Sequence, residues 1–142
     1  MFRRVKCLLA AWCVLFLLTG TALAETPRYK LLLQVTEDST DKLRIALNHA
    51  KHVQDTLGRE NVAIELVAWG PGVRTLRYYT PLDDELKEMH HRGVRIVACE
   101  KSLYAAKLKR TDLIRTFNLA TVPSGLAEIV VRQSEGWVYA AP

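Results

Sequence analysis

Residues 94–103, with the sequence VRIVACEKSL, pass directly from an apolar run typical of a buried strand to the start of a predicted helix. Cys99 lies at the junction. In open α/β sheets, ligands gather at the carboxyl ends of the strands, and a helix N-terminus there favours the thiolate, the reactive form of cysteine. Because free cysteine is also among the most frequently buried residue types, Cys99 is either a reactive thiol or a structural one.

The rest of the chain alternates between predicted strands and predicted helices. Short apolar runs predict strands at 29–36, 62–69, 94–98, 119–122 and 137–140. Between them, apolar residues recur every three or four positions, a spacing typical of amphipathic helices. One helix is expected to be capped at 38–41 and to end at Gly58, and the next to start at Thr80-Pro81. This order predicts an α/β fold, with a mostly parallel five-stranded sheet covered by helices on both faces.

In such a sheet, the loops that follow the strands meet at one edge. These loops contain residues 37–38, 70–72, 99–102 and 123–125. Cys99 is the candidate reactive group there. The residues expected to line a pocket around it are Gly70, Pro71, Gly72, Lys101, Ser102, Ser124 and Gly125. Lys101 is the nearest basic side chain and is expected to lower the pKa of the thiol, whereas Glu100 works against it.

Other chemistries fit the sequence less well. Gly70-Pro71-Gly72 lacks the spacing of a phosphate-binding loop, and its proline removes an N–H donor, so a tight turn is expected. No histidine falls in a predicted strand-exit loop, which leaves Cys99 without an evident base for hydrolysis. His49 and His52 share a helix face but have no third ligand, so we expect neither a metal site nor a cofactor. Transfer of a sulfur atom fits better, because it mainly requires an accessible thiolate.

The N-terminal residues have the pattern of a secretion signal peptide. Arg3, Arg4 and Lys6 precede the apolar stretch 7–18, and Ala22-Leu23-Ala24 is a typical small-x-small cleavage site. The apolar stretch is shorter than the roughly 20 residues of a membrane span. We therefore expect residues 1–24 to be removed, leaving residues 25–142 as one domain in the periplasm or outside the cell. An uncleaved membrane anchor is the alternative.

The charge and the cysteine content of the chain argue against nucleic-acid binding and against an internal disulfide. The 142-residue chain has a formal charge of +5, but three of its 20 basic residues lie in the predicted signal peptide. The remaining 17 basic and 15 acidic residues are interspersed, which argues against nucleic acid as a partner, because phosphate binding needs a concentrated basic face. Removal of Cys7 and Cys13 with the signal peptide leaves Cys99 without a partner for an internal disulfide.

Several motifs together resemble those of the DsrE family. They are LNHA at 47–50, AWGPGV at 68–73, GVRIVACEKSL at 93–103, VPSG at 122–125 and QSEGWVY at 133–139. Each motif is weak alone, but their order and spacing are specific, and they extend over nearly all of residues 25–142. The resemblance implies a three-layer α/β/α fold with a five-stranded parallel sheet. It also implies an oligomer, often a trimer or a hexamer.

The better-understood members of that family act in cytoplasmic sulfur oxidation and in the sulfur relay for tRNA thiolation. They carry sulfur as a persulfide on a cysteine that matches Cys99. The resemblance therefore implies that the protein is a sulfur carrier, which receives its sulfur atom from a donor protein or from a small sulfur compound. This chain departs from close relatives in its predicted export and in Lys101, where they tend to have asparagine.

A second function class stays open beside the sulfur carrier. In it, the chain is a non-catalytic, oligomeric binding module and Cys99 is a structural residue. Both classes are expected to form a homo-oligomer, because a small monomer has difficulty covering the apolar and aromatic stretch 76–79.

Overall fold

The computed structural model describes residues 26–142. The predicted signal peptide, residues 1–24, lies outside the described residues. The strands are β1 (Tyr29–Val35), β2 (Val62–Ala68), β3 (Arg95–Cys99), β4 (Ala120–Val122) and β5 (Val138–Ala140). The α-helices are α1 (Thr40–Leu57), α2 (Asp83–His91), α3 (Glu100–Ala105) and α4 (Gly125–Ser134), and three 3₁₀ segments are η1 (Arg59–Asn61), η2 (Gly70–Leu76) and η3 (Arg110–Asp112). Within residues 26–142, no helix is long and apolar enough to cross a membrane.

All five strands run in parallel, in the order β4-β3-β2-β1-β5. The predicted α/β fold class is therefore confirmed, and the sheet is entirely rather than mostly parallel. The register places Val67 beside Val97, and Cys99 beside Val122 at the carboxyl end of β3. Because neighbouring residues in a parallel ladder point to the same face, this register decides which side chains meet around the thiol.

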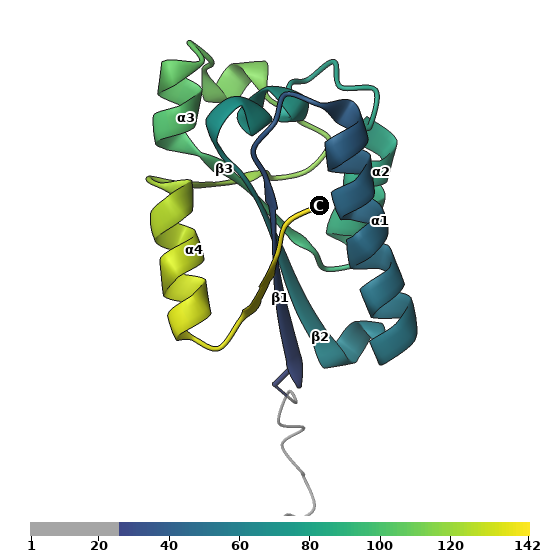
Figure 1. Cartoon of the computed structure of the whole chain (residues 1–142). Coiled ribbons are helices and arrows are strands. Elements are labelled where there is room, and N and C mark those ends of the chain that lie inside the picture. Colours follow the sequence, from purple (N-terminus) through teal and green to yellow (C-terminus); the bar gives the residue numbers. More distant parts are fainter. Residues whose placement is uncertain (1–25) are drawn as a thin grey trace, which may run out of the picture.

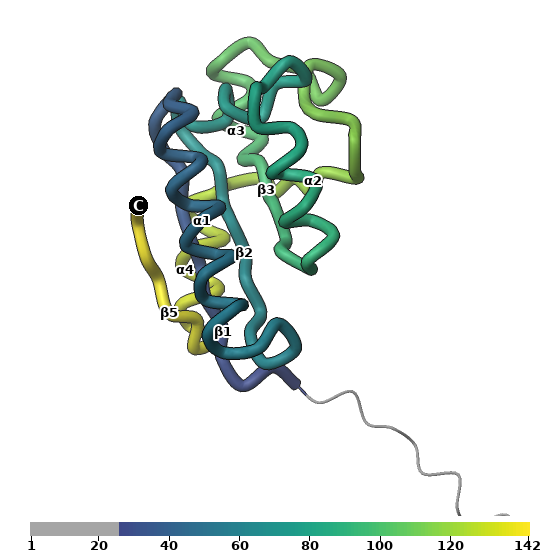
Figure 2. The backbone as a smooth tube through the Cα atoms, turned by 90° about the vertical axis from the view of Figure 1, so that its right-hand side faces the viewer, coloured from purple at the N-terminus to yellow at the C-terminus, as the bar shows by residue number. Residues whose placement is uncertain are grey.

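The sheet forms the middle layer of the molecule. Helices α1 and α2 cover one face, and α4 covers the other (Figure 1). Figure 2 shows α1 running alongside β1 and β2. The larger apolar core lies under α1 and α2 and includes Leu43, Leu66 and Leu86, whereas a smaller core of Leu32, Val67, Val97, Val122 and Ile129 lies under α4. Helix α3 lies at the end of the sheet where β1, β2 and β3 terminate (Figure 1).

Two local predictions are wrong. Helix α2 begins at Asp83, with Leu82 as its N-cap, rather than at Thr80-Pro81. The Thr80 hydroxyl instead accepts a 3.5 Å hydrogen bond from the Leu82 N–H, which makes the predicted cap part of the preceding turn. Gly70-Pro71-Gly72 is not an isolated tight turn, since these residues open the seven-residue segment η2.

Candidate functional site

Cys99 is the last residue of β3 and the N-cap of α3. The residue is buried, with 4% of its surface exposed. Gly125, the first residue of α4, approaches it closely, because a Cβ atom placed on Gly125 would lie 3.2 Å from the Cys99 Cβ and 2.7 Å from the Trp69 Cβ. The thiol is therefore enclosed by the ends of β2 and β3 and the start of α4. This agrees with the prediction that the loops after the strands meet at one edge of the sheet.

Hydrogen-bond donors surround the thiol despite its burial. Burial alone raises the pKa of Cys99, but hydrogen bonds from the Ser102 hydroxyl and from the backbone N–H groups of Gly125, Ser102 and Lys101 outweigh it and lower the pKa below its ordinary value. These donors stabilise a negatively charged sulfur in either a thiolate or a persulfide. The site can therefore hold an anionic sulfur away from bulk water.

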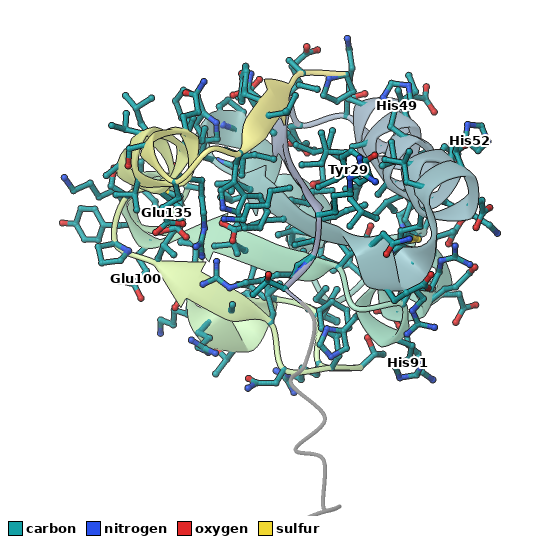
Figure 3. All side chains as sticks on the ribbon, turned by 90° about the horizontal axis from the view of Figure 1, so that it is seen from below. Tyr29, His49, His52, His91, Glu100 and Glu135 are labelled. Carbon is teal, nitrogen blue, oxygen red and sulfur yellow. The ribbon has the colours of Figure 1, made fainter. Side chains whose placement is uncertain are left out.

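The charges of the neighbouring side chains have a smaller role than the sequence suggested. Lys101 acts on the thiol through its backbone N–H. The carboxylate of Glu100 accepts a 2.9 Å hydrogen bond from the Thr121 hydroxyl of β4, and Figure 3 shows Glu100 at the rim of the molecule. Local hydrogen bonds, rather than a lysine–glutamate balance, therefore lower the pKa of the thiol.

Ser102 connects the thiol to the loop after β2. Its hydroxyl oxygen accepts a 2.8 Å hydrogen bond from the Gly70 N–H while the hydroxyl group donates to Cys99. The Lys101 N–H also lies 3.4 Å from the Pro123 carbonyl oxygen, in the loop that precedes α4. Three of the four predicted strand-exit loops are thus held together around Cys99.

A pocket of about 310 Å³ opens beside this cluster. Its lining residues are Gly70, Pro71, Arg74, Lys101, Ser102, Ala105 and Ala106. Four of the seven residues predicted to line a pocket are among them, namely Gly70, Pro71, Lys101 and Ser102. Cys99 does not itself line the pocket, whereas Ser102, which hydrogen-bonds the thiol, does.

The other three predicted residues lie near the pocket without lining it. Gly72 packs against β1, since an added Cβ atom would lie 2.1 Å from the Val35 carbonyl oxygen. Ser124 caps α4, and its hydroxyl accepts a 3.4 Å hydrogen bond from the Ala127 N–H. Gly125 allows close contact with Cys99 and Trp69. These residues shape the surroundings of the thiol, and the ligand-binding role predicted for them stays a prediction.

Sequence reasoning missed three neighbours of the site. Arg74, in η2, lines the pocket as a second cation beside Lys101. Trp69 follows β2, and its indole N–H donates a 3.1 Å hydrogen bond to the Gln34 side chain of β1. Because side chains alternate between the two faces of a strand, the sequence could have predicted Gln34 and Trp69 on the same face of the sheet as Cys99. The position of Arg74 could not be predicted in this way, because it depends on the η2 helix.

No histidine is among the groups that shift the pKa of Cys99. His49, His52 and His91 lie at the rim of the molecule in Figure 3. His90 is half-buried, and its ring stacks on Phe117 with the ring centroids 4.4 Å apart. Across residues 26–142, no group of three metal-ligating side chains is close enough to hold an ion.

Proteins with solved structures share this fold. A protein of unknown function from Methanobacterium thermoautotrophicum, MTH1491, has a solved structure that is 31% identical, with a TM-score of 0.74, over 80% of this chain and 99% of its own. A conserved protein of unknown function from Bacteroides thetaiotaomicron, BT1422, is 20% identical with a TM-score of 0.61, over 80% of this chain and 94% of its own, and shares the fold. No curated protein matches the chain. The model of the DsrE/DsrF-like family matches residues 29–139, and the chain belongs to that family.

Proposed function

We propose that this protein is a sulfur carrier that accepts a sulfur atom as a persulfide on Cys99. The observation that carries the proposal is the set of donors around the thiol, namely the Ser102 hydroxyl and the N–H groups of Lys101, Ser102 and Gly125. A purely structural thiol in an apolar core has no need of donors that stabilise its anion. Membership of the DsrE/DsrF-like family is consistent with the proposal.

The proposed reaction is a simple thiolate displacement. The Cys99 thiolate attacks the terminal sulfur of a donor persulfide, R–S–SH, and a new S–S bond forms on Cys99. The donor S–S bond breaks, its electron pair leaves on R–S⁻, and the proton stays on the transferred sulfur. No oxidant or reductant is consumed, because the transferred sulfur keeps its oxidation state. When the new persulfide on Cys99 then loses that proton to solvent, the same donors that lower the pKa of the thiol would stabilise its anion.

Sulfur loading tests the proposal directly. Incubation of the purified protein with glutathione persulfide should add one sulfur atom to the peptide that contains Cys99, as detected by mass spectrometry, and a reductant should remove it. Cys99→Ser should abolish this adduct at the same peptide. The variant should fold nearly as well as the parent, because the surrounding N–H donors can hydrogen-bond the serine oxygen.

The contrary result favours the binding-module function. In that case Cys99 resists alkylation until the protein unfolds, and Cys99→Ser lowers the free energy of unfolding by about 2 kcal/mol or more, as expected for a buried polar group without partners. Both measurements are needed because Cys99 is only 4% exposed. Slow alkylation alone would not distinguish a buried but reactive thiol from a structural core residue.

The protein is further proposed to be a homo-oligomer. Tyr78 and Tyr79 are 61% and 59% exposed, and Val138 on the edge strand β5 is 66% exposed, although Leu76 in the same predicted stretch is fully buried. Exposed apolar side chains of this kind are commonly covered by a second copy. Light scattering at micromolar concentrations should give a multiple of the monomer mass, and a monomer mass throughout that range would contradict the proposal.

A further inference from the structure

Two cationic side chains line the pocket beside Cys99. Arg74 comes from η2 and Lys101 from α3, and no carboxylate is among the lining residues. Within residues 26–142, neither side chain takes part in an ion pair. The remaining walls are small or apolar, with Pro71, Ala105 and Ala106 among them. The pocket therefore presents two uncompensated positive charges in a partly enclosed space of about 310 Å³.

The pocket and the thiol share a wall. Segments η2 and α3 lie side by side at the carboxyl end of the sheet (Figure 1). Ser102 lines the pocket, its hydroxyl oxygen accepts a 2.8 Å hydrogen bond from the Gly70 N–H, and its hydroxyl group is among the donors that lower the pKa of the Cys99 thiol. Ser102 is thus common to the lining of the pocket and to the surroundings of the thiol, and its side chain can change rotamer without movement of the backbone.

We infer that this pocket binds a small sulfur-bearing oxyanion of the thiosulfate class, with Arg74 and Lys101 as its anion-binding residues. The inference rests on the proposed function of Cys99 and identifies the class of its sulfur donor. A dianion of this size matches the two positive charges, and Arg and Lys are the usual ligands of such oxyanions in proteins. A persulfide on a donor protein needs access to the thiol but does not need a pocket with two cations.

The transfer step balances without another reactant. The Cys99 thiolate attacks the outer sulfur of thiosulfate, S–SO₃²⁻, and the new S–S bond leaves a persulfide anion on Cys99. The S–S bond of thiosulfate breaks, and its electron pair departs on sulfite, SO₃²⁻. The total charge is the same before and after the step. Arg74 and Lys101 stabilise the negative charge that collects on the sulfite group as it leaves.

Binding and transfer are measured separately to test the inference. Isothermal titration with thiosulfate should show binding by the parent protein and by Cys99→Ser, since the anion-binding residues are intact in both. Arg74→Gln and Lys101→Gln should each weaken binding by about tenfold or more, as expected for loss of one charge-assisted hydrogen bond. Lys109→Gln is the matched control, because Lys109 is exposed and does not line the pocket, and it should bind like the parent.

Release of sulfite and gain of one sulfur on Cys99 are then followed with thiosulfate and with glutathione persulfide as alternative donors. The inference predicts that Arg74→Gln and Lys101→Gln slow loading from thiosulfate while loading from glutathione persulfide changes little. Loading from glutathione persulfide with no binding of thiosulfate would overturn the inference and leave the proposed function intact. Binding of thiosulfate that depends on Arg74 and Lys101, without loading from either donor, would overturn the proposed function and with it the assignment of thiosulfate as donor.

Discussion

At the scale of single residues, the state of Cys99 is decided by a competition between burial and hydrogen bonding. Burial raises the pKa of the thiol, and it is the largest single contribution. Several donors act in the opposite direction, and their sum is greater, so the pKa is lowered. Ser102 supplies the strongest of them through its hydroxyl. Of these donors, only the Ser102 hydroxyl belongs to a side chain and can be removed by substitution, whereas the others are backbone N–H groups.

Ser102→Ala should raise the pKa of the Cys99 thiol. In the parent protein, the rate of alkylation plotted against pH should have its midpoint at a lower pH than that of a free cysteine. Loss of the Ser102 donor disfavours the thiolate, so the midpoint of the variant should move to higher pH. The Gly70 N–H, which loses its acceptor, can bind water in the open pocket, so folding should change little.

Ser124→Ala is the matched control for that substitution. It removes the N-cap of α4, which should lower the free energy of unfolding by about 1 kcal/mol. The Ser124 side chain is not among the groups that shift the pKa of Cys99, so the alkylation midpoint should stay at the parent value. Equal midpoints in all three proteins would show that Ser102 does not govern the charge of the sulfur.

At the scale of the elements, η2 is positioned by a close backbone contact with β1. The Gly72 N–H donates a 3.0 Å hydrogen bond to the Thr36 carbonyl oxygen, and its Cα packs directly on the Val35 carbonyl group. No side chain fits there, so only glycine permits this approach. Gly70 has a different requirement, because it adopts a positive φ of 55°, and a Cβ atom there would make only an ordinary van der Waals contact, 3.7 Å from the Thr36 carbonyl oxygen.

Substitutions at these two glycines should therefore have unequal effects. Gly72→Ala places a methyl group 2.1 Å from the Val35 carbonyl oxygen and should lower the free energy of unfolding by about 3 kcal/mol, at the upper end for overpacked sites. Gly70→Asn should cost about 1 kcal/mol or less, because asparagine tolerates the left-handed region. Urea denaturation measures both, and equal losses would mean that η2 is not held by the Gly72 contact.

The sequence predicted the strands and the sheet better than it predicted the contacts between segments that are far apart in the chain. The five strands and the parallel sheet followed from apolar runs with short, punctuated connections, which are local properties. The η2 helix and the approach of Gly72 to Val35 depend on contact between segments far apart in the chain, so the Gly-Pro-Gly sequence alone indicated only a turn. Arg74 entered the pocket for the same reason, since its position is set by η2 rather than by a strand.

At the scale of the whole molecule, the two faces of the sheet differ in polarity. The face under α1 and α2 is apolar, whereas the face under α4 contains Glu65, a fully buried carboxylate on the central strand. One carboxylate oxygen accepts hydrogen bonds from Arg95 at 2.6 Å and from Arg132 of α4 at 3.0 Å. The other oxygen is buried and has no hydrogen-bond partner among the described residues. The docking of α4 is thus coupled to the charge of Glu65.

Arg132→Met should lower the free energy of unfolding by about 3 kcal/mol at neutral pH, at the low end for a broken buried ion pair because Arg95 remains. Burial raises the pKa of Glu65 in the folded protein despite the two arginines. A raised pKa means that the folded state binds the proton more tightly, so its contribution to stability is complete at low pH and is lost as the pH rises through the folded pKa. Removal of Arg132 raises the pKa further, so the destabilisation should be smaller near pH 4 than at pH 8.

A second substitution separates the charge of Glu65 from the packing of Arg132. In the double variant Glu65→Leu/Arg132→Met, no carboxylate is left buried, so much of the lost stability should return and its dependence on pH should weaken. Glu135→Gln is the control. The carboxylate of Glu135 is 46% exposed, and its substitution breaks only the exposed ion pair with Arg132. The free energy of unfolding should therefore change by about 0.5 kcal/mol at most. If the double variant is as unstable as Arg132→Met, the packing of the arginine side chain, including its contact with the Trp137 ring, holds α4 in place rather than its pairing with Glu65.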